Sequence, residues 1–412
     1  MSVADTTRES SPTPVPIPAG RRTLPPTVAF GGAALAFAAF YLAAGAPTPL
    51  LVVFERQWGF PPSVLTLAFA VYAIALLGSL LVFGSLSDHV GRRPVLVAAL
   101  IVELGAMLLF VFAPDIGWVI AARVVQGVAT GAATSAFTAS VVELAPERFA
   151  RLGSVVGSIA PAGGLGVGAL LTGAAVQFSA HANLIVFGTL TVIMVLGTAV
   201  AASSAETATR RPGARRALVP KVSVPAPARR EFAAAVPVHL GAWMLSGLVM
   251  GLAPTIVRDI FAVDSGLVNG ATAFLVPASA AVSGLALGRL GARDATLLGG
   301  VGVLAGTGLL VISVATDVLP LLWVAGVVGG VGFGASFSGA LRSIAPLAQP
   351  HQRAGLFAAV YLVAYLAFGV PTLVAGLLVA PVGLLGTVLG YAVLIITTAA
   401  VGLLAQARLA RR

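Results

Sequence analysis

Between two long apolar segments lies the stretch Gly84-Ser85-Leu86-Ser87-Asp88-His89-Val90-Gly91-Arg92-Arg93-Pro94-Val95-Leu96. Residues 63–83 before it carry no charge, and residues 95–112 after it carry one, Glu103. Apolar runs of about eighteen residues or more are candidates for membrane-spanning helices. The stretch is therefore expected to be a tight charged loop at a membrane surface, where one span ends and the next begins.

The composition of the whole chain agrees with a membrane protein. Of its 412 residues 58% are hydrophobic and 9% are charged, whereas a soluble protein is about 25% charged. The mean hydropathy is +1.02. Backbone groups in a bilayer must bond within the protein, which leaves helices or closed barrels. Because the apolar runs are long and do not alternate, the sequence predicts an all-α membrane protein.

Several kinds of chemistry are disfavoured by the residues present. The net charge of +10 is better explained by arginines that mark cytoplasmic loops than by nucleic acid. The chain has no cysteine and no Gly-Lys-Ser/Thr phosphate loop. Its four histidines lie too far apart to suggest a metal site. No cofactor, no metal, no nucleic-acid partner and no enzyme activity are expected.

Twelve spans are predicted, in two pseudo-symmetric six-helix bundles. They lie roughly at 28–53, 62–84, 94–113, 117–142, 152–176, 182–202, 232–257, 265–288, 295–315, 319–345, 354–380 and 382–406. The predicted domains are a disordered cytoplasmic tail (1–27), the first half (28–202), a basic cytoplasmic linker (203–230), the second half (231–406) and a cytoplasmic tail (407–412).

The arginines predict the orientation of the chain. With the amino terminus inside, the outside loops hold only Arg56 and Arg258 of the basic residues. The opposite orientation would place most of the arginines outside, against the positive-inside rule. Both termini are therefore expected in the cytoplasm, and the protein in the cell (inner) membrane.

Residues 283–293 repeat the pattern of the opening loop about 200 positions later. Asp88 corresponds there to Gly288, so only the first copy keeps its acid. Duplicated halves are typical of transporters. The residues that match are Gly84 with Gly284, Gly91 with Gly291 and Arg93 with Arg293.

The opening loop resembles the signature of the major facilitator superfamily, Gly-x-Leu-x-Asp-x-x-Gly-Arg-Arg/Lys. Two further patterns resemble the drug/proton antiporter branch of that family. Arg123-Val124-Val125-Gln126-Gly127 matches its fourth-span motif, Arg-x-x-Gln-Gly. Residues 156–165 match its fifth-span motif in part, with Pro161 and Gly164 in register. The resemblance implies transport by alternating access, in which the two halves rock about a central site.

The resemblance also implies a gate at the inner surface, formed by Gly84, Asp88, Gly91, Arg92, Arg93, Glu143 and Arg353. Asp88 would meet the start of the eleventh span near Arg353, and Arg92 would reach Glu143. The alternative is a solvated loop whose arginines only fix the orientation. That alternative does not explain Asp88, since aspartate contributes little to topology.

Glu103 and Arg123 are charges inside spans, where charged groups usually face the bundle interior and find partners. An ion pair or a water-bridged pair is expected between them. Glu103 could exchange a proton and couple transport to it, or the two could form a static structural pair. The residues leave both readings open.

The resemblance further implies that the seventh and eleventh spans line the central cavity together with the first. Their aromatic and polar residues suit an apolar or amphipathic ligand, although each could equally be core packing. The candidates are Tyr41, Gln126, Trp243, Met244, Asn269, Tyr361 and Tyr365. In the fifth span, Gly157, Pro161, Gly164 and Gly168 predict a close seam against a neighbouring helix, or an ordinary kink. The resemblance implies that this neighbour is the eighth span.

The favoured function is that of a secondary transporter, with proton-coupled efflux of small apolar or amphipathic molecules. One alternative is an uptake carrier for a metabolite such as an organic acid, with Arg123 as the anion site. Another is a membrane sensor or scaffold without transport. The expected partners are a small-molecule substrate, protons and the lipid bilayer, and the chain is expected to act as a monomer.

Overall fold

The structure is a computed structural model that describes residues 23–410. Within these residues it is built of helices, and twelve helical segments are long and apolar enough to cross a membrane. The predicted all-α fold with twelve spans is confirmed. Positions 1–22 of the predicted amino-terminal tail, and the last two residues of the chain, lie outside the described residues.

The first half of the chain supplies six spans, of which the first is a pair of joined helices. They are α1 (Pro26–Gly45) with α2 (Pro47–Trp58), α3 (Pro62–Phe83), α5 (Arg92–Val111), α6 (Ile116–Glu143), α7 (Ala150–Phe178) and α8 (Ala182–Ser203).

The second half supplies the other six. They are α10 (Arg229–Asp259), α11 (Gly266–Ala286), α12 (Ala292–Thr316), α13 (Leu319–Ile344), α14 (Arg353–Val382) and α15 (Leu384–Ala410). Two short helices, α4 (Ser87–Val90) and α9 (Ala214–Ala217), lie outside the spans. Helix α15 continues through residues 407–410, which the sequence had assigned to a tail.

Local chemistry explains where several helices begin. Proline stands in the first turn of α1, α2, α3 and α13, where its missing N–H costs nothing. Asp115 caps α6, because its Oδ1 accepts from the backbone N–H of Gly117 at 2.8 Å and of Trp118 at 3.2 Å. Gly91 joins α4 to α5 with φ of +105°, a conformation that L side chains rarely adopt.

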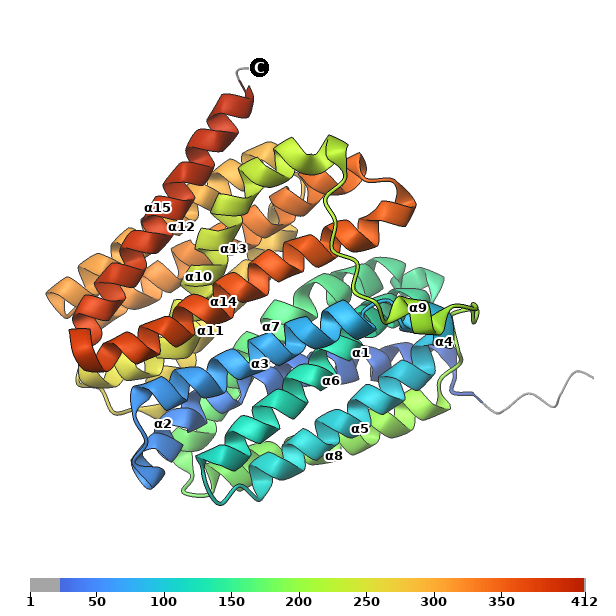
Figure 1. The fold of residues 1–412 in the computed structure, drawn as a ribbon. Coiled ribbons are helices and arrows are strands. Elements are labelled where there is room, and N and C mark those ends of the chain that lie inside the picture. The colour runs from blue at the N-terminus through green and yellow to red at the C-terminus, as the bar shows by residue number, and fades with distance from the viewer. Residues whose placement is uncertain (1–22, 411–412) are drawn as a thin grey trace, which may run out of the picture.

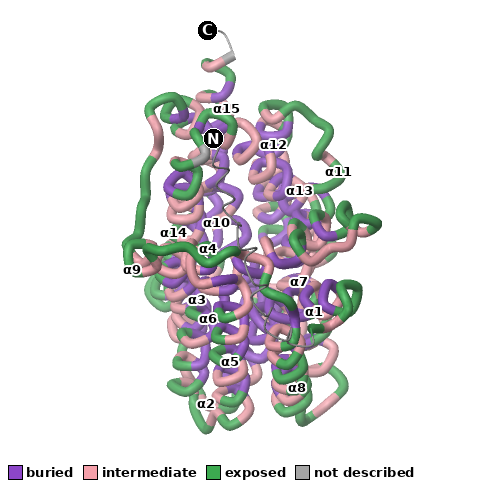
Figure 2. The backbone as a smooth tube through the Cα atoms, turned by 90° about the vertical axis from the view of Figure 1, so that its right-hand side faces the viewer, coloured by how far each residue is buried: buried purple, intermediate pink, exposed green. Residues whose placement is uncertain are grey.

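The helices form two bundles that meet along two pairs of helices (Figure 1). One pair is α3 with α14, and the other is α7 with α11. Each bundle has its own apolar core, and the buried residues run along the inside of both bundles in Figure 2. The bundle surfaces carry exposed leucines, valines and isoleucines, as expected of helices that face lipid.

Glycines bring α7 and α11 together. A Cβ on Gly173 would lie 2.5 Å from the Gly266 oxygen and 2.7 Å from the Gly270 Cα, so the backbones touch there. A Cβ on Gly166 would lie 3.0 Å from the Phe274 oxygen. Small residues allow such close approach of membrane helices. The predicted partner of the fifth span, the eighth, is therefore the one observed.

The glycines predicted for this seam lie elsewhere. Gly164 and Gly168 pack against α1 of their own bundle, where added Cβ atoms would meet Tyr41 and Leu42. Gly157 faces Thr138 of α6, and Pro161 lies inside α7. Helix α7 thus presents one glycine face to α1 and another to α11. The sequence could not separate these two faces, because both are rich in glycine.

The two bundles are closer at one end than at the other. We call the end that carries α4, α9 and residues 204–225 the linker end, and the other the opposite end. Near the opposite end, a Cβ on Gly376 of α14 would clash with Thr66 of α3. Shared apolar clusters continue to Leu76 and Tyr365. Beyond them α3 and α14 diverge toward the linker end (Figure 1).

Enlarging Gly173 to valine should force α7 and α11 apart. Overpacking a close contact costs about 1–3 kcal/mol, so the melting temperature of the purified protein should fall by several degrees. The control is Gly308→Val in α12, where an added Cβ has nothing within 4 Å. Equal melting temperatures for the two variants would contradict the close contact.

Candidate functional site

Two ion pairs join the bundles at the opposite end. Arg258 of α10 contacts Glu55 of α2, with Nη1 to Oε2 at 2.6 Å. Arg56 of α2 contacts Asp264, with Nη1 to Oδ2 at 2.7 Å. The sequence had treated both arginines only as outside charges. The acids beside them, Glu55 and Asp259, were the available signal.

The two pairs differ in how far water reaches them. The side chains of Arg258 and Glu55 are 21% and 10% exposed, whereas those of Arg56 and Asp264 are 47% and 71% exposed. The hydrogen bond from Arg56 still holds the pKa of the Asp264 carboxyl below its usual value. Exposed pairs contribute little, so Arg258 with Glu55 is the stronger tie.

At the linker end, the charged loop bonds mainly within its own bundle. Arg92 Nη1 contacts Asp88 Oδ1 at 2.5 Å, and Arg92 Nη2 contacts Glu143 Oε1 at 3.4 Å. The expected approach of Arg92 to Glu143 is therefore present. The expected approach of Asp88 to Arg353 is not, since Arg353 Nε donates to the Ala348 oxygen in its own bundle at 3.3 Å. The diverging bundles explain the difference.

The linker is docked on this loop, which the sequence did not suggest. The Glu206 carboxylate accepts from the backbone N–H of Arg92 at 2.8 Å and of Arg93 at 3.2 Å. It thereby caps the amino terminus of α5, where negative charge is favourable. Thr207 Oγ1 donates to Glu143 at 2.5 Å, and the Arg211 N–H donates to the His89 oxygen at 3.0 Å.

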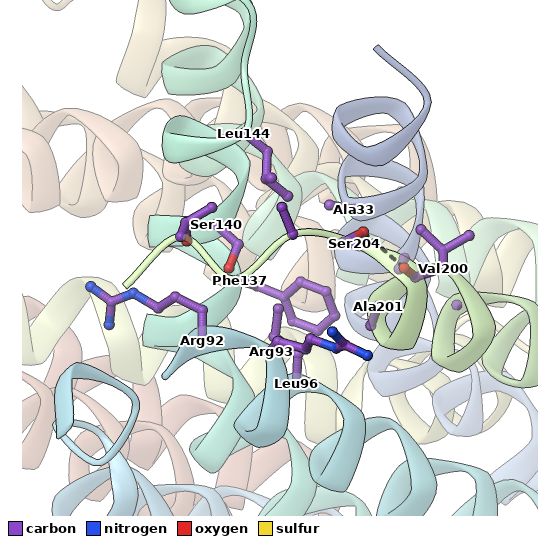
Figure 3. Close-up of a pocket in the computed structure, with 14 residues that line it drawn as sticks. Ala33, Arg92, Arg93, Leu96, Phe137, Ser140, Leu144, Val200, Ala201 and Ser204 are labelled. Carbon is purple, nitrogen blue, oxygen red and sulfur yellow. Dashed lines mark hydrogen bonds between the residues drawn. The ribbon is translucent and has the colours of Figure 1, made fainter. Parts of the chain in front are cut away.

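The docked linker explains the second signature glycine. A Cβ on Gly91 would lie 2.3 Å from Glu206 Oε2, so a side chain there would displace the cap. The first signature glycine, Gly84, accepts a hydrogen bond from Ser135 Oγ at 2.5 Å. Below the cap is a small cavity, with Arg92 and Arg93 on one side and Ser140 and Ser204 on others (Figure 3).

A buried polar cluster lies inside the first bundle. Gln126 stands between the two charges that were expected to pair. Its Nε2 donates to Glu103 Oε1 at 3.1 Å, and its Oε1 accepts from Arg123 Nη1 at 2.6 Å. Arg123 also donates to the Ala44 and Ala68 oxygens, both at 3.1 Å. The amide of Gln126 thus connects Glu103 to Arg123.

Three of the predicted substrate residues are buried. Gln126 is fully buried, and its amide is occupied in the polar cluster. Met244 is 3% exposed and packs in the core of the second bundle. Asn269 is 6% exposed on the second turn of α11, near the opposite end. Their side chains belong to the interior in this conformation.

The other predicted aromatics belong to one cluster on the second bundle, with Trp243 of α10 at its centre. The ring centroid of Trp243 lies 5.2 Å from that of Tyr365, and Tyr365 lies 6.2 Å from Tyr361. All three side chains are partly exposed. Tyr41 lies on α1 of the first bundle, where its hydroxyl bonds Thr134 Oγ1 at 2.8 Å.

Further members of this cluster were missed. Phe333 and Phe337 of α13 and His239 of α10 surround Trp243, with centroids at 5.1, 6.1 and 6.0 Å. The spacing of the two phenylalanines, one helical turn apart, was the available signal. The Trp243 Nε1 and both His239 nitrogens have no hydrogen-bond partner in the structure.

The aromatic cluster reaches the first bundle. Phe368 of α14 lies 5.8 Å from Trp243 and 4.8 Å from Phe69 of α3, measured between ring centroids. These rings meet where the bundles begin to diverge. The cluster, which we call the Trp243 cluster, is therefore a largely uncharged aromatic surface at the junction of the bundles.

Comparisons with known proteins agree with this architecture. The family model described as Major Facilitator Superfamily matches residues 33–293. Over 81 residues the chain is 33% identical to the uncharacterized MFS-type transporter YybF of Bacillus subtilis (strain 168). That match spans 20% of each of the two chains.

Two solved structures share the fold. One is a bacterial homolog of the human lysosomal transporter Spinster, in an inward-facing and unoccupied conformation. It has a TM-score of 0.70 and 13% identity over 92% of this chain and 97% of its own. The other is the human organic anion transporter MFSD10, with a TM-score of 0.61 and 18% identity over 94% of this chain and 100% of its own.

Removing the Arg258 guanidinium should release the opposite end. Arg258→Ala leaves the largely buried Glu55 carboxylate without its partner on the other bundle, which costs about 1.5–3 kcal/mol. The conformation that is open at the linker end then loses a stabilising contact, so conformations with that end closed become more populated. Spin labels on Glu147→Cys and Leu347→Cys at the linker end should therefore be closer on average. The chain has no cysteine of its own to interfere.

Arg56→Ala is the matched control, since its pair is exposed and should contribute about 0.2–1 kcal/mol. An Arg258→Ala distance distribution identical to that of the unchanged protein would argue against this tie.

Proposed function

The chain belongs to the Major Facilitator Superfamily and is a secondary transporter, and we propose that it exports small apolar or amphipathic molecules in exchange for protons. The observation that carries the proposal is the Trp243 cluster, an aromatic surface without a carboxylate or arginine at the junction of the bundles. Aromatic walls with few polar groups suit apolar ligands. The unpartnered Trp243 N–H offers one hydrogen bond to fix a ligand's orientation.

The orientation in the membrane is part of the proposal. The positive-inside rule supports a cytoplasmic linker end, with both termini in the cytoplasm. The protein would lie in the cell inner membrane, and a single chain would be the working unit. The cytoplasmic linker (203–230) then joins the halves 28–202 and 231–406. In this orientation the structure corresponds to an inward-facing conformation, tied by Arg258 and Glu55 on the outside.

The gate follows from the charges at the linker end. Asp88 and Arg92 are paired within the loop in this conformation. When the linker end closes, Asp88 approaches the start of α14, whose backbone N–H groups and Arg353 favour a negative charge. Opening then returns Asp88 to Arg92. Gly84, Gly91, Arg93 and Glu143 hold the loop in place through the whole cycle.

Glu103 is the proposed proton-coupling group. It is the one acid within the spans of the described residues that is completely buried. Its Oε1 accepts from Gln126, while its Oε2 has no hydrogen-bond partner. Buried acids in transporters often serve proton relays. Arg123 balances its charge through the Gln126 amide.

The arrangement of Arg123 disfavours the organic-acid carrier. An anion site needs several free guanidinium donors, but Arg123 is 3% exposed, and its Nε and Nη1 donate to the Ala68, Ala44 and Gln126 oxygens. The guanidinium also lies over the Tyr72 ring, 4.1 Å from its centroid. Flux measurements test the direction and the coupling of transport.

Glu103→Gln should uncouple transport from protons. The glutamine keeps the shape and can accept the Gln126 hydrogen bond, but it cannot exchange a proton. In proteoliposomes, uphill efflux of an amphipathic dye such as ethidium driven by a pH gradient should be lost, while exchange without a gradient persists. Unchanged gradient-driven efflux would exclude Glu103 as the coupling group, and no flux of any dye in the unchanged protein would refute the export of such molecules.

Trp243→Ala should weaken dye binding about tenfold or more, because it removes the central ring of the cluster. Trp243→Phe keeps a ring but loses the N–H, and should have a smaller effect. The control is Trp118→Ala, a ring that is 45% exposed at the start of α6. Binding is measured by dye fluorescence, and equal affinities for Trp243→Ala and Trp118→Ala would contradict the assignment.

A further inference from the structure

The first span has a weak joint between α1 and α2. Pro47 and Pro49 follow Ala46 and have no N–H to donate. In a regular helix their N–H groups would bond the oxygens of Ala43 and Gly45, four residues earlier. Both of those residues lie in the buried core. An unpaired carbonyl there is costly, because no water reaches it.

Gln126 supplies the missing donor. Its Nε2 donates to the Ala43 oxygen at 3.0 Å, in addition to its bond to Glu103. Arg123, one turn away on α6, donates to the next oxygen, that of Ala44, at 3.1 Å. Helix α6 therefore holds the joint from the side with two side chains. Arg123 and Glu103 fix the orientation of the Gln126 amide from its two ends.

A change of bend at this joint would move the far end of α2, which contacts the other bundle. Glu55 and Arg56, which pair with Arg258 and Asp264, lie near the end of α2. Glu55 is roughly 12 Å along the helix from Pro47, so a change of about 15° in the bend moves it by about 3 Å. Such a movement is enough to break a 2.6 Å contact to Arg258.

We propose that Gln126 is a positioning residue that sets the bend between α1 and α2 and thereby aligns the ion pairs that close the opposite end. Gln126 touches neither the Trp243 cluster nor the ion pairs themselves. It acts through the Ala43 carbonyl, which Pro47 leaves without a helix donor. The bend exists in the protein without substrate, so the structural part of the inference does not depend on transport. Only an effect of Gln126 on flux rests on the proposed function.

A double substitution tests this role. Gln126→Leu removes the amide and keeps the volume, so α2 should lose its fixed direction. Spin labels on Gln57→Cys and Leu267→Cys, both exposed at the opposite end, should report a shift of about 3 Å or a clearly broader distribution. Pro47→Ala restores an N–H that can bond the Ala43 oxygen. Combined with Gln126→Leu, it should recover at least half of the change.

The matched control is Thr138→Val, which removes a hydroxyl that bonds its own helix at the Thr134 oxygen. Its distance distribution should equal that of the unchanged protein. If Gln126→Leu does not fold, recovery of folded protein by Pro47→Ala is the same test. A folded Gln126→Leu with an unchanged distribution, or a defect that Pro47→Ala leaves untouched, overturns the proposal.

The distances are measured without dye or a proton gradient. A protein that shows the rescue but moves no dye would retain this inference and refute the transport proposal. A protein that exports dye but shows no rescue would do the reverse.

Discussion

A backbone oxygen that has lost its helical donor inside a bilayer must find another donor within the protein. The structure of the first bundle depends on this constraint. Pro47 in the first span leaves the Ala43 oxygen without its helical donor. Gln126 of α6 donates to that oxygen, and Arg123 of α6 donates to the neighbouring Ala44 oxygen. A buried arginine is costly without a nearby negative charge, and Glu103 supplies that charge through the Gln126 amide. Thus four helices (α1, α3, α5 and α6) meet around one connected set of polar groups.

The rest of the fold divides its attractive contacts unequally between its two ends. At the opposite end, backbone meets backbone through Gly173 and Gly270, and charges pair across the bundles. At the linker end, the charges of the signature loop are satisfied inside one bundle by Asp88 and Glu143. Because those charges already have partners, separating the bundles there leaves neither carboxylate without a partner. The arrangement with the linker end open therefore has a low free-energy cost without a ligand.

The sequence was sufficient to predict the spans and the partner helices. Long apolar runs determine the spans, and the structure agrees with them. The resemblance to a known family implied the partner of the fifth span, and α7 packs against α11 in the structure. The sequence was insufficient wherever the rotation of a helix decides the contact. Gly164 and Gly166 are two positions apart, yet one faces α1 and the other α11. Glu103 and Arg123 were expected to form an ion pair or a water-bridged pair, but the amide of Gln126 lies between them.

The same limit applies to long-range contacts of polar segments. Nothing in the composition of residues 203–230 distinguishes a free linker from one whose Glu206 caps α5. Such a cap needs only one carboxylate at one place, and the sequence has several acids near the membrane surface. Trp243 and Tyr365 were recognisable as aromatic residues in spans that line the centre of this fold. Their neighbours on α13 were not, because that helix was not expected to contribute.

The docked linker also acts as a tether. It is bonded to the first bundle as far as Ala217, which accepts from Ser85, and to the second from Ser223, whose N–H donates to Gly355. Only residues 218–222 lie between these attachments, and the chain can stretch about 20 Å over that length. The ends of α3 and α14 at the linker end cannot separate beyond what this length allows while both attachments hold. The covalent chain itself therefore sets an upper limit on the width of the mouth, and so on the size of what can pass through it.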